Sequence, residues 1–151
     1  MTTTTTMSEL ASLKGRELGT SDWFEVTQER VNTFADATDD HQWIHVDIER
    51  ANKESPFGGP IAHGYLTLSL LIPMWSQVLT VTDAKMGVNY GLNKVRFPAP
   101  VPVGARIRLT ATLKDVEEVQ GGLQLTVSAV IEQEGGQKPV CIAEPVFRTY
   151  G

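Results

Sequence analysis

The feature that most constrains this chain is a run of apolar residues from 61 to 79, which is long enough for a helix and apolar in nearly every direction around it. A helix that is apolar all round has to be enclosed by other structure. A membrane span needs roughly 20 predominantly apolar residues, whereas this run is interrupted by His63, Thr67, Ser69, Pro73 and Gln77. We therefore expect a core helix, kinked or divided near Pro73, because proline removes a helical hydrogen bond.

The segments that follow this run alternate between apolar and polar residues, as half-buried strands do. Residues 106–114 and 123–131 place their apolar side chains on one face, and glycine pairs at 121–122 and 135–136 separate consecutive strands. With a last strand at 140–150, this pattern predicts an antiparallel meander. Residues 88–97 also favour a strand, and the phase slip between Leu92 and Val95 predicts a bulge near Asn93.

A curved antiparallel sheet with one apolar face can enclose an apolar helix, so we expect an α+β fold in which the sheet wraps a long central helix. The open sheet edges predict pairing with a second copy. Residues 1–20 are expected to form a partly disordered tail and lead-in, and residues 21–151 one domain. The opening threonine run has no basic stretch and no apolar block, so it does not resemble a secretory signal.

Before the apolar run, residues 22–26 favour a short strand, and Thr27 favours the start of a helix to about Ala37. Asp47 can cap a brief helical turn, and the proline and glycine residues of 55–60 predict a loop. The formal net charge of -5 argues against a nucleic-acid surface. The single cysteine, Cys141, excludes an internal disulfide and favours a reducing, cytoplasmic setting.

Asp40 and His45 are the candidate acid–base pair, because a carboxylate and an imidazole lie five residues apart just after the predicted helix. On a regular helix they would point about 140° apart, so they can face one substrate only if a turn separates them. Taken alone, Asp40 can simply cap a turn and His45 can be a buried structural histidine. His41 and His45 also have the spacing of helical metal ligands, but we expect no metal, because no third strong ligand is evident.

Three motifs in order resemble the MaoC-like dehydratase family: residues 34–47 (FADATDDHQWIHVD), residues 59–64 (GPIAHG), and Val95-Arg96-Phe97 with the proline-rich segment to Gly104. The similarity is closest to the (R)-specific enoyl-CoA hydratases of the branch related to nodulation protein N, and runs from about residue 21 to 150. It departs from the family at Asp39, where the family has glycine, and at Gln42-Trp43, where Asn-Pro is common.

The resemblance implies a hot-dog fold, a homodimer and syn addition of water to a trans-2-enoyl-CoA, giving the (R)-3-hydroxyacyl-CoA. It places the catalytic residues at Asp40 and His45 and the oxyanion-hole amide at Gly64. Coenzyme A is then part of the substrate, and no separate cofactor is expected. Two alternatives stay open: a hot-dog acyl-CoA thioesterase, and a non-catalytic acyl-CoA-binding module.

Four further residues are assigned to substrate binding: His63, Asn93, Lys94 and Arg96. Lys94 and Arg96 are expected to contact the phosphates of coenzyme A, since fixed cations suit that role. Each assignment has a simpler alternative. His63 can bond backbone at the junction of loop and helix, Asn93 can accommodate the bulge, and the two cations can form a solvated strand face.

Overall fold

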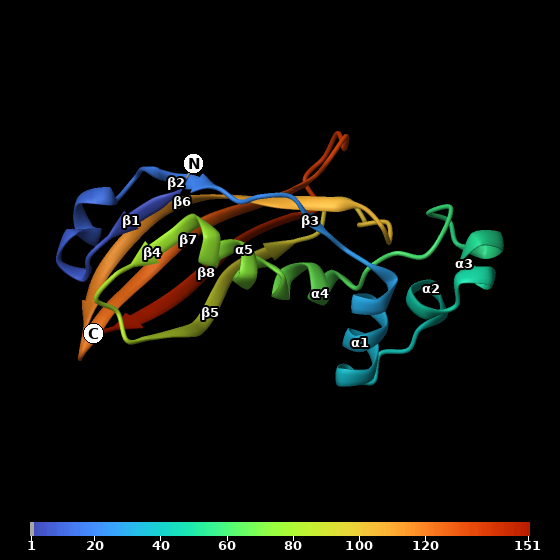
Figure 1. Cartoon of the computed structure of the whole chain (residues 1–151), viewed down its shortest axis with the longest axis horizontal. Helices are drawn as coiled ribbons and strands as arrows, with labels where there is room; N and C mark the ends of the chain where they lie inside the picture. The colour runs from blue at the N-terminus through green and yellow to red at the C-terminus, as the bar shows by residue number, and fades with distance from the viewer. Residues whose placement is uncertain (1) are drawn as a thin grey trace.

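The computed structural model describes residues 2–151, and its main feature is a six-stranded antiparallel sheet (Figure 1). The strands lie in the order β2-β6-β7-β8-β5, and β3 also pairs with β6. Their bounds are β2 Glu17–Thr20, β3 Phe24–Glu25, β5 Met86–Arg96, β6 Arg106–Val119, β7 Gly122–Gln133 and β8 Cys141–Tyr150. The predicted meander is β6-β7-β8, and β5 forms one edge of the sheet.

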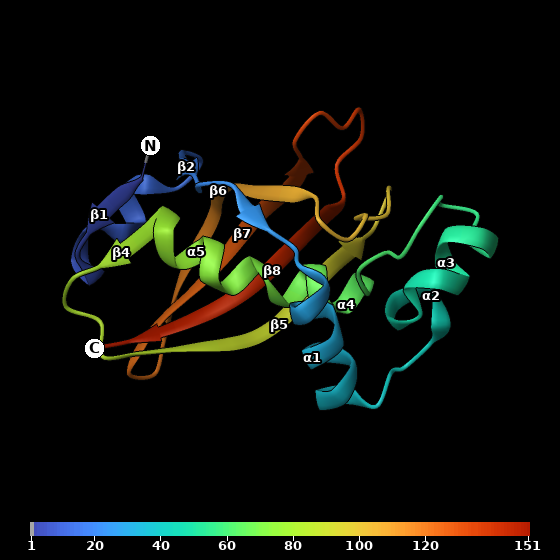
Figure 2. The ribbon, with the colours of Figure 1, turned by 45° about the vertical axis from the view of Figure 1, so that its right-hand side comes forward.

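The apolar face of the sheet packs against two consecutive helices, α4 (Gly64–Ser69) and α5 (Leu71–Val78) (Figure 2). The alternating residues of β6 that were expected to face inward are all fully buried: Ile107, Leu109, Ala111 and Leu113. Leu66, Leu71, Met74 and Val78 of the helices belong to the same core. This arrangement confirms the α+β architecture of a sheet packed around a central helix.

The central helix is divided at Leu70, three residues before Pro73. Proline has no N–H to bond the carbonyl of Ser69, so the helix restarts with Pro73 in the first turn of α5. The expectation that other structure encloses every side of this helix is wrong for the single chain. Tyr65 is exposed, and Ile72 and Trp75 are only half-buried.

The bulge predicted in β5 is present, because the register against β8 shifts between Leu92 and Val95. A second irregularity lies between Asn89 and Gly91. The strand is exposed along nearly its whole length. β5 is therefore an uncovered edge strand of 11 residues.

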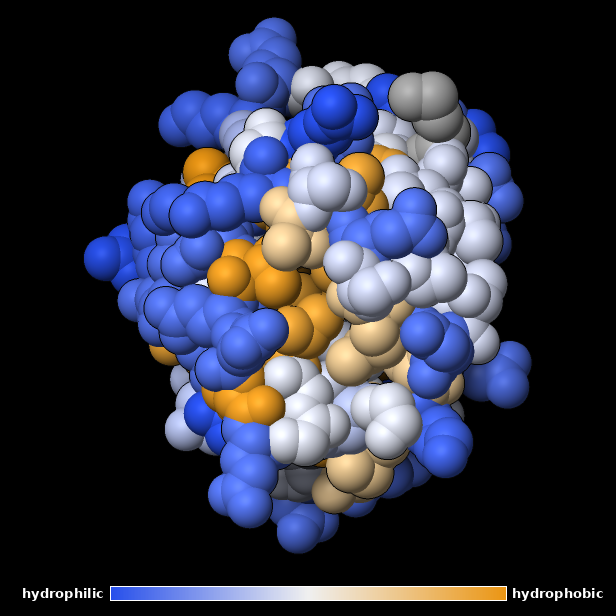
Figure 3. All heavy atoms as spheres, turned by 90° about the vertical axis from the view of Figure 1, so that its left-hand side faces the viewer, coloured by the Kyte–Doolittle hydropathy of each residue, from blue (hydrophilic) through white to orange (hydrophobic). Residues whose placement is uncertain are grey.

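The N-terminal segment differs from the predicted tail. β1 (Thr3–Thr5) pairs in parallel with β4 (Leu79–Val81), and a 3-10 helix, η1 (Met7–Leu13), follows it. Leu10 and Leu18 are buried in the core, although residues 1–20 were expected to lie outside the domain. The two buried leucines, together with a strand of β-branched threonines that pairs with β4, thus make this segment part of the folded domain. Met1 lies outside the described residues. Figure 3 shows the side of the molecule that carries β1 and η1, with an apolar stripe between hydrophilic side chains.

Three short helices, α1 (Gln28–Thr38), α2 (Trp43–Val46) and α3 (Ile48–Glu54), lie beyond one end of the sheet (Figure 1). The predicted caps are confirmed, since Thr27 accepts a bond from the Arg30 amide and Asp47 from the Arg50 amide. None of the helices in residues 2–151 combines the length and apolar character needed to cross a membrane.

Candidate active site

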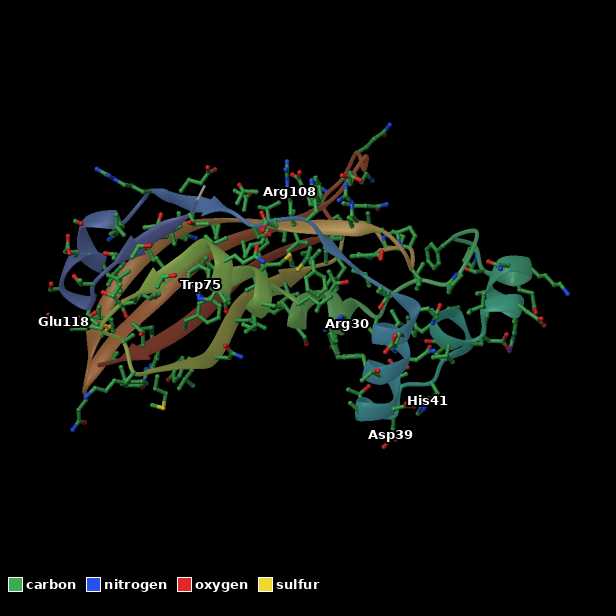
Figure 4. The ribbon with its side chains drawn as sticks, in the orientation of Figure 1. Arg30, Asp39, His41, Trp75, Arg108 and Glu118 are labelled. Atoms are coloured by element: carbon green, nitrogen blue, oxygen red, sulfur yellow. The ribbon has the colours of Figure 1, made fainter. Side chains whose placement is uncertain are left out.

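The loop that carries Asp40 begins where α1 ends. Asp39 adopts the left-handed conformation (φ 58°, ψ 28°), and the Asp40 amide still bonds the Ala35 carbonyl. Asp39 is the position at which the related family has glycine, and left-handed backbone is the conformation that glycine adopts most readily. Aspartate tolerates it better than most residues do. Figure 4 shows Asp39 and His41 at the far end of this helical segment, away from the sheet.

The turn brings Asp40 and His45 together, as their spacing required, and it adds His63. One carboxylate oxygen of Asp40 and one ring nitrogen from each histidine lie within 4.8 Å of one another. Asp40 is half-exposed, whereas His45 and His63 are buried at 7% and 3% exposure. A single water can span such a gap, since each of its hydrogen bonds covers about 2.8 Å.

His45 is fixed in one tautomer by the backbone. Its Nδ1 lies 2.6 Å from the Ile61 carbonyl oxygen, which only accepts, so Nδ1 carries the hydrogen and Nε2 keeps its lone pair. Burial lowers the pKa of His45 below its ordinary value of 6.5, and the neighbouring His63 lowers it further. The bond to the Ile61 carbonyl and the Asp40 carboxylate act in the opposite direction and raise this pKa. A histidine held neutral, with one free nitrogen, is suited to accept a proton.

Gly64 is the first residue of α4, where helical amides have no acceptor within the helix. A side chain here would meet the Phe97 ring, because an added Cβ would lie 3.2 Å from two of its carbons. A cavity of about 350 Å³ lies beside Gly64, and its lining includes Ile61, Thr67, Phe97 and Val101. The absence of a side chain therefore keeps the start of the helix accessible from this cavity.

The other three residues predicted to bind substrate lie at the end of β5. The Asn93 amide donates to Glu144 at 2.8 Å, so its side chain bridges strands. Lys94 is exposed, and Arg96 donates to the neighbouring Val95 carbonyl. Neither cation forms a salt bridge within residues 2–151.

The structure adds three groups that the sequence analysis missed: the Ile61 carbonyl, the Phe34 ring beside His63, and the Phe97 ring over Gly64. A backbone carbonyl gives no sequence signal. The two phenylalanines lie inside the motifs that carried the resemblance, and that position was the available clue.

The cluster of possible metal ligands is not the pair suggested by spacing. His41 is exposed and pairs with Asp36 at 2.9 Å, whereas the clustered groups belong to Asp40, His45 and His63. His45 and His63 each have one ring nitrogen bonded to a backbone carbonyl, so each ring has one nitrogen left. The absence of a metal stays a prediction.

Cys141 is fully buried, and burial raises the pKa of its thiol to about 11. The thiol is therefore held protonated, and it is not one of the candidate catalytic groups.

The chain belongs to the MaoC-like domain family, whose pattern matches residues 9–135. It is 54% identical over 149 residues to 3-hydroxyacyl-thioester dehydratase Z of Mycobacterium tuberculosis (strain H37Rv), covering 98% of each chain. It is 45% identical over 139 residues to nodulation protein N of Rhizobium meliloti, covering 91% of this chain and 86% of that one. The predicted resemblance, including its branch, is confirmed.

Solved structures confirm the hot-dog fold. A monoamine oxidase regulatory protein from Archaeoglobus superposes with a TM-score of 0.77 at 23% identity, covering 100% of this chain and 99% of that one. The R-hydratase PhaJ1 from Pseudomonas aeruginosa superposes with a TM-score of 0.72 at 20% identity, covering 91% and 81%.

Proposed function

We propose that this protein is a hydro-lyase that interconverts a trans-2-enoyl thioester and the (R)-3-hydroxyacyl thioester by addition and removal of water. The dehydratase named among its relatives supports the reaction class, at 54% identity over nearly the whole chain. The observation that carries the chemistry is the convergence of the Asp40 carboxylate and a His45 nitrogen within 4.8 Å. Positioned acid–base groups of this kind contribute roughly 10²–10⁴-fold in rate.

In the proposed mechanism, Asp40 and His45 hold one water between them. Since His45 Nδ1–H is committed to Ile61, the water gives its proton to Nε2 as its oxygen bonds to the β-carbon. The π electrons of the double bond move toward the thioester and form an enolate. The imidazolium then returns the proton from Nε2 to the α-carbon. Both new bonds form on one face, which makes the addition syn.

The enolate oxygen needs a donor, and the Gly64 amide is proposed for this role. It stands at the start of α4 and beside the cavity of about 350 Å³. Loss of one such donor costs about 3–4 kcal/mol of transition-state stabilisation in measured cases. Gly64→Ala keeps the amide but forces the Phe97 ring to move, so we expect reduced turnover from restricted access.

Lys94 and Arg96 are proposed to bind the phosphates of coenzyme A. They lie at the end of β5 that leads into Phe97, whose ring lines the cavity beside Gly64. Lys94→Gln and Arg96→Gln should raise KM for an enoyl-CoA with little change in kcat. Lys85→Gln is the matched control, because Lys85 immediately precedes the other end of the same strand.

We propose that the protein is a homodimer joined through β5. The strand is an edge, and it exposes Met86, Val88, Tyr90 and Leu92 at 39–57%. Long apolar edge strands invite pairing, and a two-fold axis satisfies both copies at once. Sedimentation should give twice the chain mass, and Leu92→Glu should shift it toward the monomer, whereas Glu118→Gln on β6 should not.

The decisive test is incubation of the purified protein with a short trans-2-enoyl-CoA. Hydration removes the absorbance of the conjugated double bond without releasing free thiol. Thiol release would instead identify a thioesterase, and binding without turnover would identify a binding module. The acidic net charge and the absence of a basic cluster in the sequence still argue against nucleic acid as a partner.

A further inference from the structure

His63 begins α4 through its backbone rather than through its side chain. Its carbonyl accepts the amides of Leu66 and Thr67, and its ring makes no capping bond. The ring is nevertheless 3% exposed. Burying an imidazole is costly unless its polar atoms are bonded, so its partners indicate what the ring does here.

The first partner is the loop that carries Asp40. His63 Nε2 lies 2.9 Å from the Asp40 carbonyl oxygen, which only accepts, so Nε2–H donates. The two residues are 23 positions apart, and the bond joins the start of the central helix to the acid loop. Asp40 is half-exposed and its loop is otherwise tied back to α1 through its own amide. The bond from His63 therefore holds the carbonyl group of Asp40.

The second partner is the ring of His45. The two imidazoles stack with their ring centroids 3.9 Å apart and an angle of 24° between their planes. The Phe34 ring lies beside His63 in a tilted geometry, with the two ring centroids 4.9 Å apart. The Ile61 bond fixes one edge of His45. The face of His63 then limits rotation of the ring about that bond.

The remaining atom, His63 Nδ1, is buried and has no partner within residues 2–151. With the hydrogen on Nε2, Nδ1 is an acceptor without a donor. The other tautomer would leave Nε2 and the Asp40 carbonyl oxygen as two facing acceptors with no hydrogen between them. The surroundings thus favour a single, fixed tautomer.

We propose that His63 is a positioning residue for the acid–base pair, holding the Asp40 loop through Nε2–H and the His45 ring through its face, without touching substrate. This inference rests on the proposed function and replaces the earlier assignment of His63 to substrate binding. The proposal predicts that the two contacts can be removed separately, because the Nε2 atom makes the bond to Asp40 and the face of the ring makes the contact with His45.

Two variants separate the contacts. His63→Phe keeps a ring face and loses the donor, whereas His63→Gln keeps an amide donor and loses the ring. Each should lower kcat by about 10- to 100-fold with KM within about twofold, because small displacements of reacting groups are costly. Val127→Ala, in the buried sheet, is the control for destabilisation alone and should leave both constants unchanged below its unfolding temperature.

The pH profile adds a readout that simple destabilisation does not move. The titratable groups that face His45 are His63 and Asp40, and Gln28 of α1 contacts it only as an uncharged donor to its carbonyl. His63 helps to lower the pKa of His45, so its removal should move the acid limb of kcat to higher pH. A raised KM with unchanged kcat would place His63 on the substrate and overturn the proposal. Unchanged kcat with an unmoved acid limb would also overturn it.

A measurement without substrate separates this inference from the proposed function. The chain has three histidines, so ¹⁵N spectra can be assigned with His41→Gln and His45→Gln. The expected result is an Nε2–H tautomer for His63, as its bond to the Asp40 carbonyl requires, and an Nδ1–H tautomer for His45, as its bond to the Ile61 carbonyl requires. An Nδ1–H tautomer for His63 would contradict the proposal even if the protein is an active hydratase. Failure of hydration with these tautomers present would count against the function alone.

Discussion

The sheet and the helical segment of this protein bury different kinds of atoms. In the meander β6-β7-β8, Thr149 is the only buried polar residue among the described residues, and the rest of the buried face is apolar. The segment from α1 to α4 buries His45, His63 and Thr67 within 23 residues of sequence. The buried apolar side chains of the sheet require only packing, whereas buried imidazoles require specific hydrogen bonds. From this difference we propose that the sheet supplies stability and that the helical segment supplies the groups for catalysis.

The largest expected effect comes from the acid–base pair. Asp40→Asn and His45→Gln should each lower the rate of enoyl-CoA hydration by roughly 10²–10⁴-fold, because His45 carries the proton and Asp40 holds the water that supplies it. The effects should be strongly non-additive, since both residues act on one water.

Asp36→Asn and His41→Gln are the matched controls, because Asp36 and His41 form an exposed pair of the same types only a few residues away. They should leave the rate within about twofold of wild type. Equal losses in both pairs would show that the whole segment, and not the buried pair, governs the rate.

A core truncation in the sheet tests the other half of the comparison. Leu109→Ala should lower the free energy of unfolding by about 2–5 kcal/mol, since Leu109 is fully buried. Turnover per folded molecule should stay near wild type below the unfolding temperature. Denaturant titration and initial rates measure the two effects, and Thr110→Ala on the outer face is the control. A large loss of turnover in folded Leu109→Ala would show that the core of the sheet contributes to catalysis as well as to stability.

The regular half of the molecule was predictable because burial there follows a period of two residues. The alternation in 106–114 identified the inward side chains of β6 correctly, and the slip after Leu92 located the bulge in β5. The N-terminal segment was missed because its two apolar anchors, Leu10 and Leu18, follow no such period.

The site was predictable in its parts but not in its arrangement. The spacing of Asp40 and His45 required a turn, and the turn is present. The stacking of His45 on His63 and the bond from His45 to Ile61 depend on how the loop before α4 meets α2. Such contacts join residues 16–18 positions apart through a backbone path that no local pattern specifies.

A smaller effect is expected from Asp39, where the helical segment departs from regular backbone. Asp39→Gly should raise the free energy of unfolding by up to about 1 kcal/mol, because glycine adopts a φ of 58° without a Cβ clash. Asp36→Gly, inside α1, should lower it by roughly 0.3 kcal/mol, because glycine is a poorer helix former than aspartate. Opposite signs in thermal unfolding would confirm that the turn at Asp39, and not helix propensity, sets the response. Destabilisation by Asp39→Gly would contradict this reading.

The smallest effect is a dependence of stability on pH. His45 has a lowered pKa when folded, so the unfolded chain binds more protons in the window from 6.5 down to that lowered value. Stability should therefore fall as the pH drops through this window. Unfolding titrations of wild type and His45→Gln measure the difference, and the variant should lose this part of the dependence. An identical dependence in both proteins would exclude His45 as its source.

The most direct test of the central claim is hydration of a short trans-2-enoyl-CoA in D₂O, with the product resolved by configuration and deuterium content. Addition of one water by Asp40 and His45 predicts the (R)-3-hydroxyacyl-CoA, carrying one deuterium at carbon 2 on the face that receives the hydroxyl. An (S) product, deuterium on the opposite face, or cleavage of the thioester would contradict the account.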